Sequence, residues 1–210
     1  MAPQQFDREK FKDAVHYIVV NTRPDELGLV KLHKVLYFSD MLWFLGRGTA
    51  LTRAEYRKQQ FGPCASFLRR ALSDLEQAGR IQQSREWYFG YDKHSFASLT
   101  DAPLQRLTDA ERSLLSDVID FVCRNNTAKS ISEFSHTRAW EAASLGQVMP
   151  YYTAINILPA EIDDEDLDWA MEEAAKIGTE RSRGSSLQRR GYTEFREGLR
   201  RHRGEVAARG

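Results

Sequence analysis

The chain has little cysteine, no net charge and no long apolar run. Its two cysteines, Cys64 and Cys123, form no CxxC pair and give no metal-ligand spacing, so we expect reduced thiols and no metal site. No apolar stretch approaches the roughly 20 residues that span a bilayer, and the first residues lack the basic and apolar regions of a signal peptide. We therefore expect a cytoplasmic protein that does not bind membranes.

Thirty basic residues balance thirty acidic ones, so no overall field favours nucleic acid or an anionic membrane as a partner. The 210 residues, 41% of them apolar, suffice for one sizeable core. The charge is uneven, however, because an acidic run at 161–173 precedes an arginine- and glycine-rich end. Apolar residues are sparse in that end, which predicts a disordered basic tail over 179–210, with a transient helix near 192–203.

The stretch Leu29–Phe44 organises the rest of the sequence. Its apolar residues recur at steps of three and four, which predicts a helix with a wide, aromatic-rich buried stripe and packing partners on more than one side. Beside the stripe, His33, Tyr37, Asp40 and Phe44 follow one another at steps of four, three and four, so they share one helix face. We interpret this line as a polar-aromatic seam along a central helix.

The remaining patterns predict a mainly α protein: a compact multi-helix domain with a small β-hairpin. Gly62-Pro63 is expected to open a helix, because proline is tolerated at an early helical position. Thr108 and Glu111 have the spacing of a capping box at another helix start. The segment 51–61 could be helical or extended. We predict helices over 6–21, 63–78, 108–124, 130–135, 138–144 and 163–177, and a hairpin over 81–99 with its turn at 91–95.

Three stretches, in this order, resemble the SocA-like antitoxin family, also called the Panacea domain. Lys31–Asp40 is similar to the family's Lys-Leu-x-Lys-Leu-Leu-Tyr opening, and Tyr56 through Phe61-Gly62-Pro63 to its aromatic-Gly-Pro step. Ile131–His136 with a following tryptophan is similar to its Leu-Ser-x-x-Ser-His…Trp ending. Two positions depart from the pattern: His33 replaces a common glutamine, and Cys64 a common small apolar residue. The motif residues are Lys31, His33, Lys34, Tyr37, Asp40, Phe61, Gly62, Pro63, His136 and Trp140.

The resemblance implies a bacterial or phage protein that neutralises a toxin encoded beside it by binding that toxin directly. It also implies a mostly helical fold with a small β element. One family member resembles an adaptor that delivers its toxin to an ATP-dependent protease, so such a protease is a further candidate partner. The expected organisation is an N-terminal helix packing on the core (1–26), the antitoxin-like domain (27–145), a C-terminal helical extension (146–178) and the tail.

His136 and Trp140 stand one helical turn apart and have two interpretations. They could fill the core, or they could meet the seam of His33, Tyr37 and Asp40 and form a polar pocket. A buried His–Asp pair is catalytic in some enzymes. Because no serine elbow, paired carboxylates or activated cysteine accompanies it, we expect no enzymatic activity and no cofactor.

The helix predicted over 63–78, followed by a hairpin, also fits a winged-helix DNA-binding regulator. Arg69 and Arg70 would then enter the major groove. Asp74 and Glu76 lie on or beside the same face and would repel phosphates, so DNA is the less favoured partner.

Four aromatic residues are candidates for contacts with a protein partner, since aromatic side chains dominate binding hot spots. The same residues fit equally well into the core. They are Trp87, Tyr88, Tyr151 and Tyr152.

Overall fold

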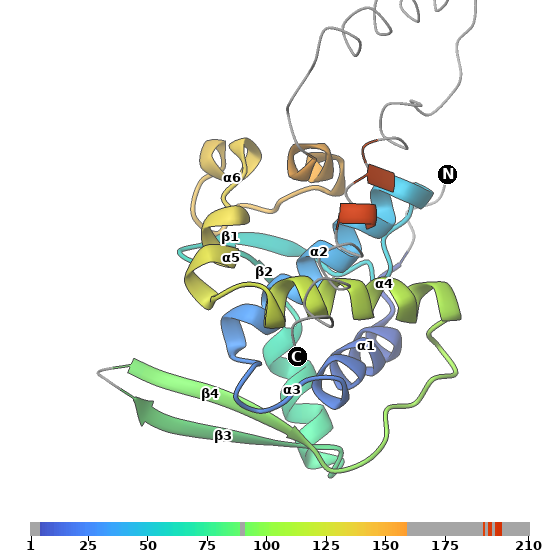
Figure 1. Ribbon diagram of the computed structural model, residues 1–210, viewed down its shortest axis with the longest axis vertical. Coiled ribbons are helices and arrows are strands. Elements are labelled where there is room, and N and C mark those ends of the chain that lie inside the picture. The colour runs from blue at the N-terminus through green and yellow to red at the C-terminus, as the bar shows by residue number, and fades with distance from the viewer. Residues whose placement is uncertain (1–4, 89–90, 159–190, 192, 195, 199–210) are drawn as a thin grey trace, which may run out of the picture.

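The computed structural model describes residues 5–88, 91–158, 191, 193–194 and 196–198. It is mainly α with two small antiparallel strand pairs, which confirms the predicted fold class (Figure 1). The helices are α1 (Arg8–Val20), α2 (Leu29–Arg47), α3 (Leu68–Gln77), α4 (Asp109–Ile119), α5 (Ala128–Phe134) and α6 (Arg138–Ala142). A π-helix, η1 (Asp120–Arg124), continues α4, and η2 (Tyr151–Ile157) is a 3-10 helix.

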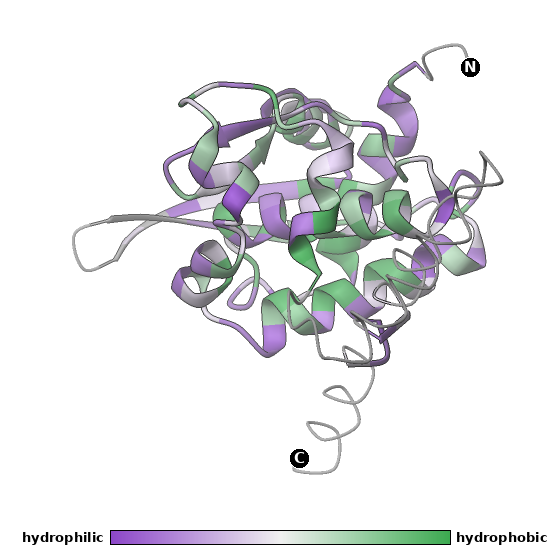
Figure 2. Cartoon of the chain, turned by 90° about the horizontal axis from the view of Figure 1, so that it is seen from above, coloured by the Kyte–Doolittle hydropathy of each residue, from purple (hydrophilic) through white to green (hydrophobic). Residues whose placement is uncertain are grey.

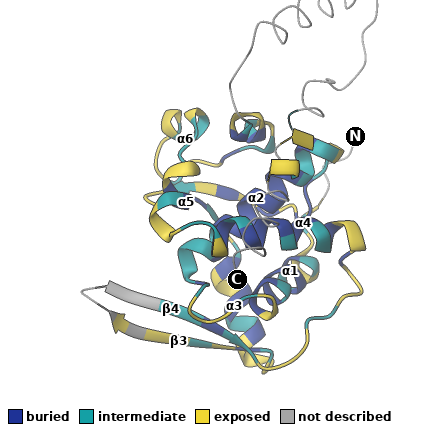
Figure 3. Ribbon diagram, viewed as in Figure 1, coloured by how far each residue is buried: buried dark blue, intermediate teal, exposed yellow. Residues whose placement is uncertain are grey.

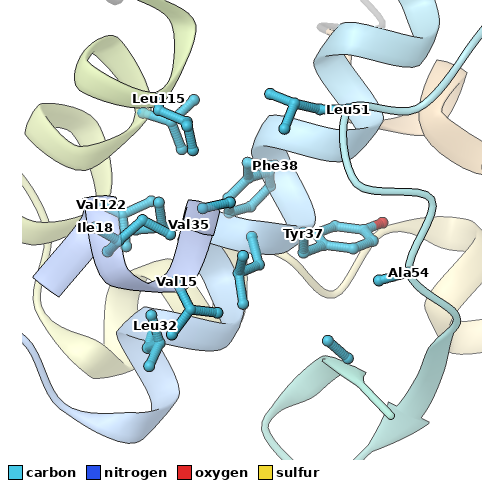
Figure 4. Close-up of a cluster of buried hydrophobic side chains, with 14 of the residues drawn as sticks. Val15, Ile18, Leu32, Val35, Tyr37, Phe38, Leu51, Ala54, Leu115 and Val122 are labelled. Carbon is cyan, nitrogen blue, oxygen red and sulfur yellow. The ribbon is translucent and has the colours of Figure 1, made fainter. Parts of the chain in front are cut away.

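Helix α2 is the centre of the fold, as its sequence predicts. Every residue from Lys34 to Leu42 is buried, because α1, α4, α5, η2 and strand β2 (Gly62–Ala65) all pack against it. Figure 3 shows the buried residues gathered along α2 and on the helix faces turned toward it. Apolar side chains of α1 and α4 meet those of α2 in one cluster (Figure 4). The helix ends at Gly48, whose φ of 71° is the left-handed conformation of many C-caps.

Side-chain caps start several of the helices. The Asp7 carboxylate accepts the Lys10 N–H at 3.0 Å at the beginning of α1. Thr108 and Glu111 form the reciprocal capping box predicted for α4. Figure 2 shows hydrophobic residues where these helices face one another and hydrophilic residues on their outer sides.

The prediction that Gly62-Pro63 opens a helix is wrong. These residues begin β2, which pairs antiparallel with β1 (Tyr56–Gln59), and α3 starts only at Leu68. Proline fits this strand because it faces Lys58, whose N–H turns the other way and donates to the Gln147 carbonyl at 2.9 Å. An isolated antiparallel bridge joins Arg57 of β1 to Val148.

The predicted β-hairpin exists, but its turn lies earlier than 91–95. Strand β3 (Ile81–Tyr88) pairs with β4 (Tyr91–Ser98), and Tyr88 is the register partner of Tyr91. Ile81 and Phe96 are buried at the base of the hairpin and fix this register, so the polar residues after Tyr91 continue the strand. The hairpin extends beyond the helices in both views (Figures 1 and 2).

Most of the C-terminal predictions concern residues outside the described part of the chain. These include the helix over 163–177, the acidic run and nearly all of the basic tail. Residues 191, 193–194 and 196–198 are helical, within the region predicted to form a transient helix. Arg196 Nε lies 3.4 Å from Asp117 Oδ2 of α4. Within the described ranges, no helix has the length and apolar character needed to cross a membrane.

Candidate functional site

The three motif stretches, which lie far apart in the sequence, are neighbours in the structure. The hydroxyl of Ser132 on α5 donates to the Phe61 carbonyl at 2.8 Å. On the other side of β2, the Ala65 N–H donates to His33 Nδ1 of α2 at 3.1 Å. The β1–β2 hairpin therefore contacts the motif segments of both α2 and α5, which also contact each other. We call the region built from these stretches the motif junction; it comprises Lys34, Lys58, Gly62, Ser135, His136 and Trp140.

Lys34 is the buried charge of the junction. Its side chain is fully buried, and its only hydrogen bond among the described residues is a long one, 3.5 Å, from Nζ to the Pro63 carbonyl. No carboxylate of the described chain forms an ion pair with it. Burial lowers the pKa of Lys34 from 10.5 to about 8. A buried ammonium with so little compensation is costly for stability.

Gly62 makes room for this lysine. A Cβ added there would collide with Lys34 Nζ and with Ser135 Oγ, and the φ of 98° is in any case suited to glycine. The Ser135 hydroxyl is itself buried and donates to the Ser132 carbonyl at 2.7 Å. The glycine of the aromatic-Gly-Pro step is thus explained by a close approach of α2 and α5 to β2.

His136 and Trp140 stack on each other beside Lys34. Their ring centroids are 3.7 Å apart with an interplanar angle of 5°. Lys58 Nζ lies 4.1 Å from the centroid of the Trp140 ring and donates to the carbonyls of Ala143 and Glu141, at 2.9 and 3.3 Å. His136 Nε2 and Trp140 Nε1 are buried and have no hydrogen-bond partner within the described residues. Burial, followed by the charges of Lys34 and Lys58, lowers the pKa of His136.

Asp40 belongs to a separate buried cluster. It accepts hydrogen bonds from the Thr52 N–H and hydroxyl, both at 2.5 Å, and from the Tyr56 hydroxyl at 2.8 Å. Burial raises the pKa of Asp40, although these hydrogen bonds oppose the shift. The Tyr151 hydroxyl lies 3.4 Å from the same carboxylate and donates to the Ala54 carbonyl at 2.5 Å. Asp40 therefore ties η2 and the chain before β1 to the central helix.

The predicted seam is divided in the structure. His33 is turned toward β2, where burial lowers its pKa to about 4, whereas Asp40 bonds to the segment around Thr52. Between them, Tyr37 is fully buried in edge contact with Tyr56 at 5.4 Å, and its hydroxyl has no partner in the described part. Lys31 lies apart, with Nζ donating to the Cys123 carbonyl at 2.8 Å. No hydrogen bond joins the described side chains of His33, Asp40 and His136 into one constellation.

The candidate partner-binding aromatics occupy different environments. Trp87 on the hairpin and Tyr152 on η2 are 74% and 72% exposed. Tyr151 is partly buried against Phe44, and the side chain of Tyr88 lies outside the described part. Phe61 is 57% exposed at the β1–β2 turn, next to α5, which carries the partly exposed Phe134.

Arg69 and Arg70 lie on the exposed face of α3. Arg70 Nε forms an ion pair with Asp74 Oδ1 at 2.9 Å, and Lys12 lies 3.9 Å from the same carboxylate. The acidic residue that argued against phosphate binding thus neutralises one of the two arginines.

Sequence reasoning missed two members of the junction. Ser135 lies inside the Ser-His motif, and this position could have identified it as a site residue. No sequence pattern assigns Lys58 to the site, because only folding brings it next to α6. The two cysteines are free thiols, and within the described ranges no group of three or more His, Cys, Asp or Glu could hold a metal ion.

The protein is mainly helical, and its three motif stretches meet at the motif junction. A comparison with protein-family models matches residues 32–141 to the antitoxin SocA-like, Panacea domain. This is more than half of the chain, and the chain belongs to this antitoxin family. Searches of the curated proteins and of the solved structures return no match.

Proposed function

We propose that the protein is a non-catalytic antitoxin that neutralises a cognate toxin by direct protein–protein binding. The observation that carries the proposal is the family match over residues 32–141, which includes all three motif stretches except Lys31 at the start of the first. Neutralisation by binding needs only mass action. At a free antitoxin concentration of about one hundred times the dissociation constant, the bound toxin is favoured by about 2.7 kcal/mol.

The surface beside the motif junction supports this function. Phe61 exposes aromatic area at the β1–β2 turn, where its carbonyl accepts from Ser132 of α5, and the ammonium of Lys58 lies over the Trp140 ring. Aromatic anchors surrounded by polar groups are the usual composition of a binding hot spot. We propose that the toxin covers this face.

Expression of the adjacent reading frame in a bacterial host tests the proposal. We expect that frame to arrest growth when it is expressed alone, and co-expression of this protein to restore growth. The two proteins should then elute as one complex in size-exclusion chromatography. Absence of a growth arrest, or rescue with no detectable complex, would overturn the proposal.

The antitoxin could also neutralise the toxin by delivering it to an ATP-dependent protease. Toxin half-life in the rescued cells separates the two mechanisms. A stable toxin supports simple blocking, and a toxin that disappears only when the antitoxin is present supports an adaptor role.

Operator binding is the less supported alternative, because Arg70 is paired with Asp74. A gel-shift assay on the promoter region of the operon tests it. Binding that weakens steeply with salt and is lost when both Arg69 and Arg70 are changed to alanine would favour a DNA-binding regulator.

A further inference from the structure

The motif junction holds two lysines without an ion pair, although Glu133 and Glu141 are close enough to oppose the lowering of the His136 pKa. Elsewhere, many described cations are paired, as Lys10 is with Glu111 at 2.6 Å and Arg106 with Asp13 at 2.9 Å. Lys34 and Lys58 form no ion pair with any described carboxylate. In a chain with equal numbers of acidic and basic residues, this local imbalance is not explained by composition. The unpaired positive charge of these two lysines is complementary to a negative group from outside the described fold.

The junction also holds buried donors that lack acceptors. Trp140 Nε1 can only donate, and His136 Nε2 donates in one of its two neutral tautomers. Leaving such a donor buried and unpaired is unfavourable, because it has lost its hydrogen bonds to water. A carboxylate offers about four lone-pair sites and could accept from both nitrogens while it faces the ammonium of Lys58.

Lys58 is held in place for such a role. Two backbone carbonyls and the face of the Trp140 ring fix its ammonium, so little side-chain entropy is lost when an anion arrives. Helix α6, which carries Trp140, has only five residues and none of them is buried. Ala139 and Trp140 nevertheless pack against the core, so an anion reaches the buried nitrogens of the His136–Trp140 stack only when α6 shifts. The positive charge of the buried Lys34 would attract that anion as well.

We propose that the motif junction binds an aspartate or glutamate side chain of an acidic segment on the toxin. The proposal rests on the proposed function and adds the chemistry that the antitoxin recognises. The exposed Phe61, whose carbonyl accepts from Ser132 of α5, favours a protein over a nucleic acid, because a nucleic-acid interface is polar and strongly positively charged. Only a few donors converge here, which suits one carboxylate better than a run of phosphates.

The test uses the full chain labelled with ¹⁵N and follows the indole N–H signals of its four tryptophans. The probe is a capped polyglutamate peptide of about ten residues, and a capped polyglutamine peptide of equal length is its control. We expect a saturable shift of the Trp140 signal, assigned with Trp140→Phe, while the signal of the exposed Trp87 stays in place. No saturable shift, or an equal shift with polyglutamine, would overturn the proposal.

Matched variants locate the binding. Lys58→Met and Lys34→Met should each weaken the binding of the polyglutamate peptide by at least about tenfold. Lys129→Met removes the same charge from the exposed side of neighbouring α5, where the side chain is 86% exposed, and should leave affinity unchanged. If all three variants lose the same affinity for the peptide, the binding depends on net charge alone, and a specific site is refuted.

Two further titrations distinguish the source of the anion. Sodium acetate that saturates the Trp140 shift at the same carboxylate concentration as the peptide would assign the site to free small carboxylates and refute the protein segment. If inorganic phosphate or duplex DNA binds more tightly than polyglutamate, an acidic protein segment is refuted as the ligand as well. Because no toxin is present, a negative result here leaves the growth-rescue test of the proposed function intact.

Discussion

Lys34 is a charged side chain that is fully buried, and its cost to the stability of the fold can be measured. We expect Lys34→Met to raise the free energy of unfolding by about 1–3 kcal/mol at pH 7, because methionine fills similar space without burying an ammonium. The pKa of Lys34 is about 8 in the folded protein and 10.5 in the unfolded chain, so this cost is full below pH 8 and shrinks as the pH rises toward 10.5. Urea denaturation at pH 7 and pH 9.5 should show the gap between variant and wild type narrowing by about 1–2 kcal/mol.

A Lys34→Met protein that is more stable yet binds its partner less well would indicate that the lysine is retained for recognition. If the variant is instead less stable at pH 7, the lysine holds the junction together and the binding argument loses its support.

His33 makes a second residue-scale prediction, on the acid side. Its pKa is lowered to about 4, so between pH 6.5 and 4 the unfolded chain binds a proton that the folded protein does not, and stability falls as the pH falls. His33→Gln keeps an acceptor for the Ala65 N–H but does not titrate. Between pH 7 and pH 5 the wild type should lose about 1–2 kcal/mol more than the variant in thermal or urea unfolding. Parallel stability profiles for the two proteins would contradict this assignment.

At the scale of elements, the β1–β2 turn depends on the absence of a side chain at Gly62. Gly62→Ala should destabilise the protein by about 2–4 kcal/mol, because the new methyl meets Lys34 and Ser135 at a positive φ. Gly79→Ala is the matched control, since Gly79 also has a positive φ, of 66°, but nothing within 4 Å of the added Cβ. It should cost only about 1 kcal/mol. Equal losses of unfolding free energy in the two variants would mean that backbone strain alone explains Gly62.

The elements also show what the sequence can predict. Helices with an apolar period and a local cap were predicted closely, as with Thr108 and Glu111, because the interacting residues are three apart. Gly62-Pro63 was misread, because the partner that makes proline acceptable in β2 is the Lys58–Gln147 pairing, which involves a residue 89 positions after Lys58. The hairpin turn was placed late for the same reason, since burial of Ile81 and Phe96 sets the register.

At the scale of the whole molecule, three motifs that are separately weak converge on one place, and their order in the sequence was enough to predict the family. The content of the site was less predictable. The seam of His33, Tyr37 and Asp40 appeared as one face in the helical period, but the structure divides it between β2 and the segment around Thr52. Lys58 joins the site only through folding, so no local pattern contains it.

The last prediction concerns which face of the molecule meets the toxin. Phe61→Ala should weaken the toxin complex by at least about tenfold and abolish growth rescue, because a 57% exposed aromatic beside the junction is a natural anchor. Leu99→Ala, at the base of the hairpin and 55% exposed, is the control and should leave both unchanged. Unfolding midpoints of both variants should stay close to wild type, since exposed side chains contribute little to stability. If Trp87→Ala breaks rescue and Phe61→Ala does not, the contact surface is the β3–β4 hairpin, and the carboxylate site at the junction cannot be the main point of recognition.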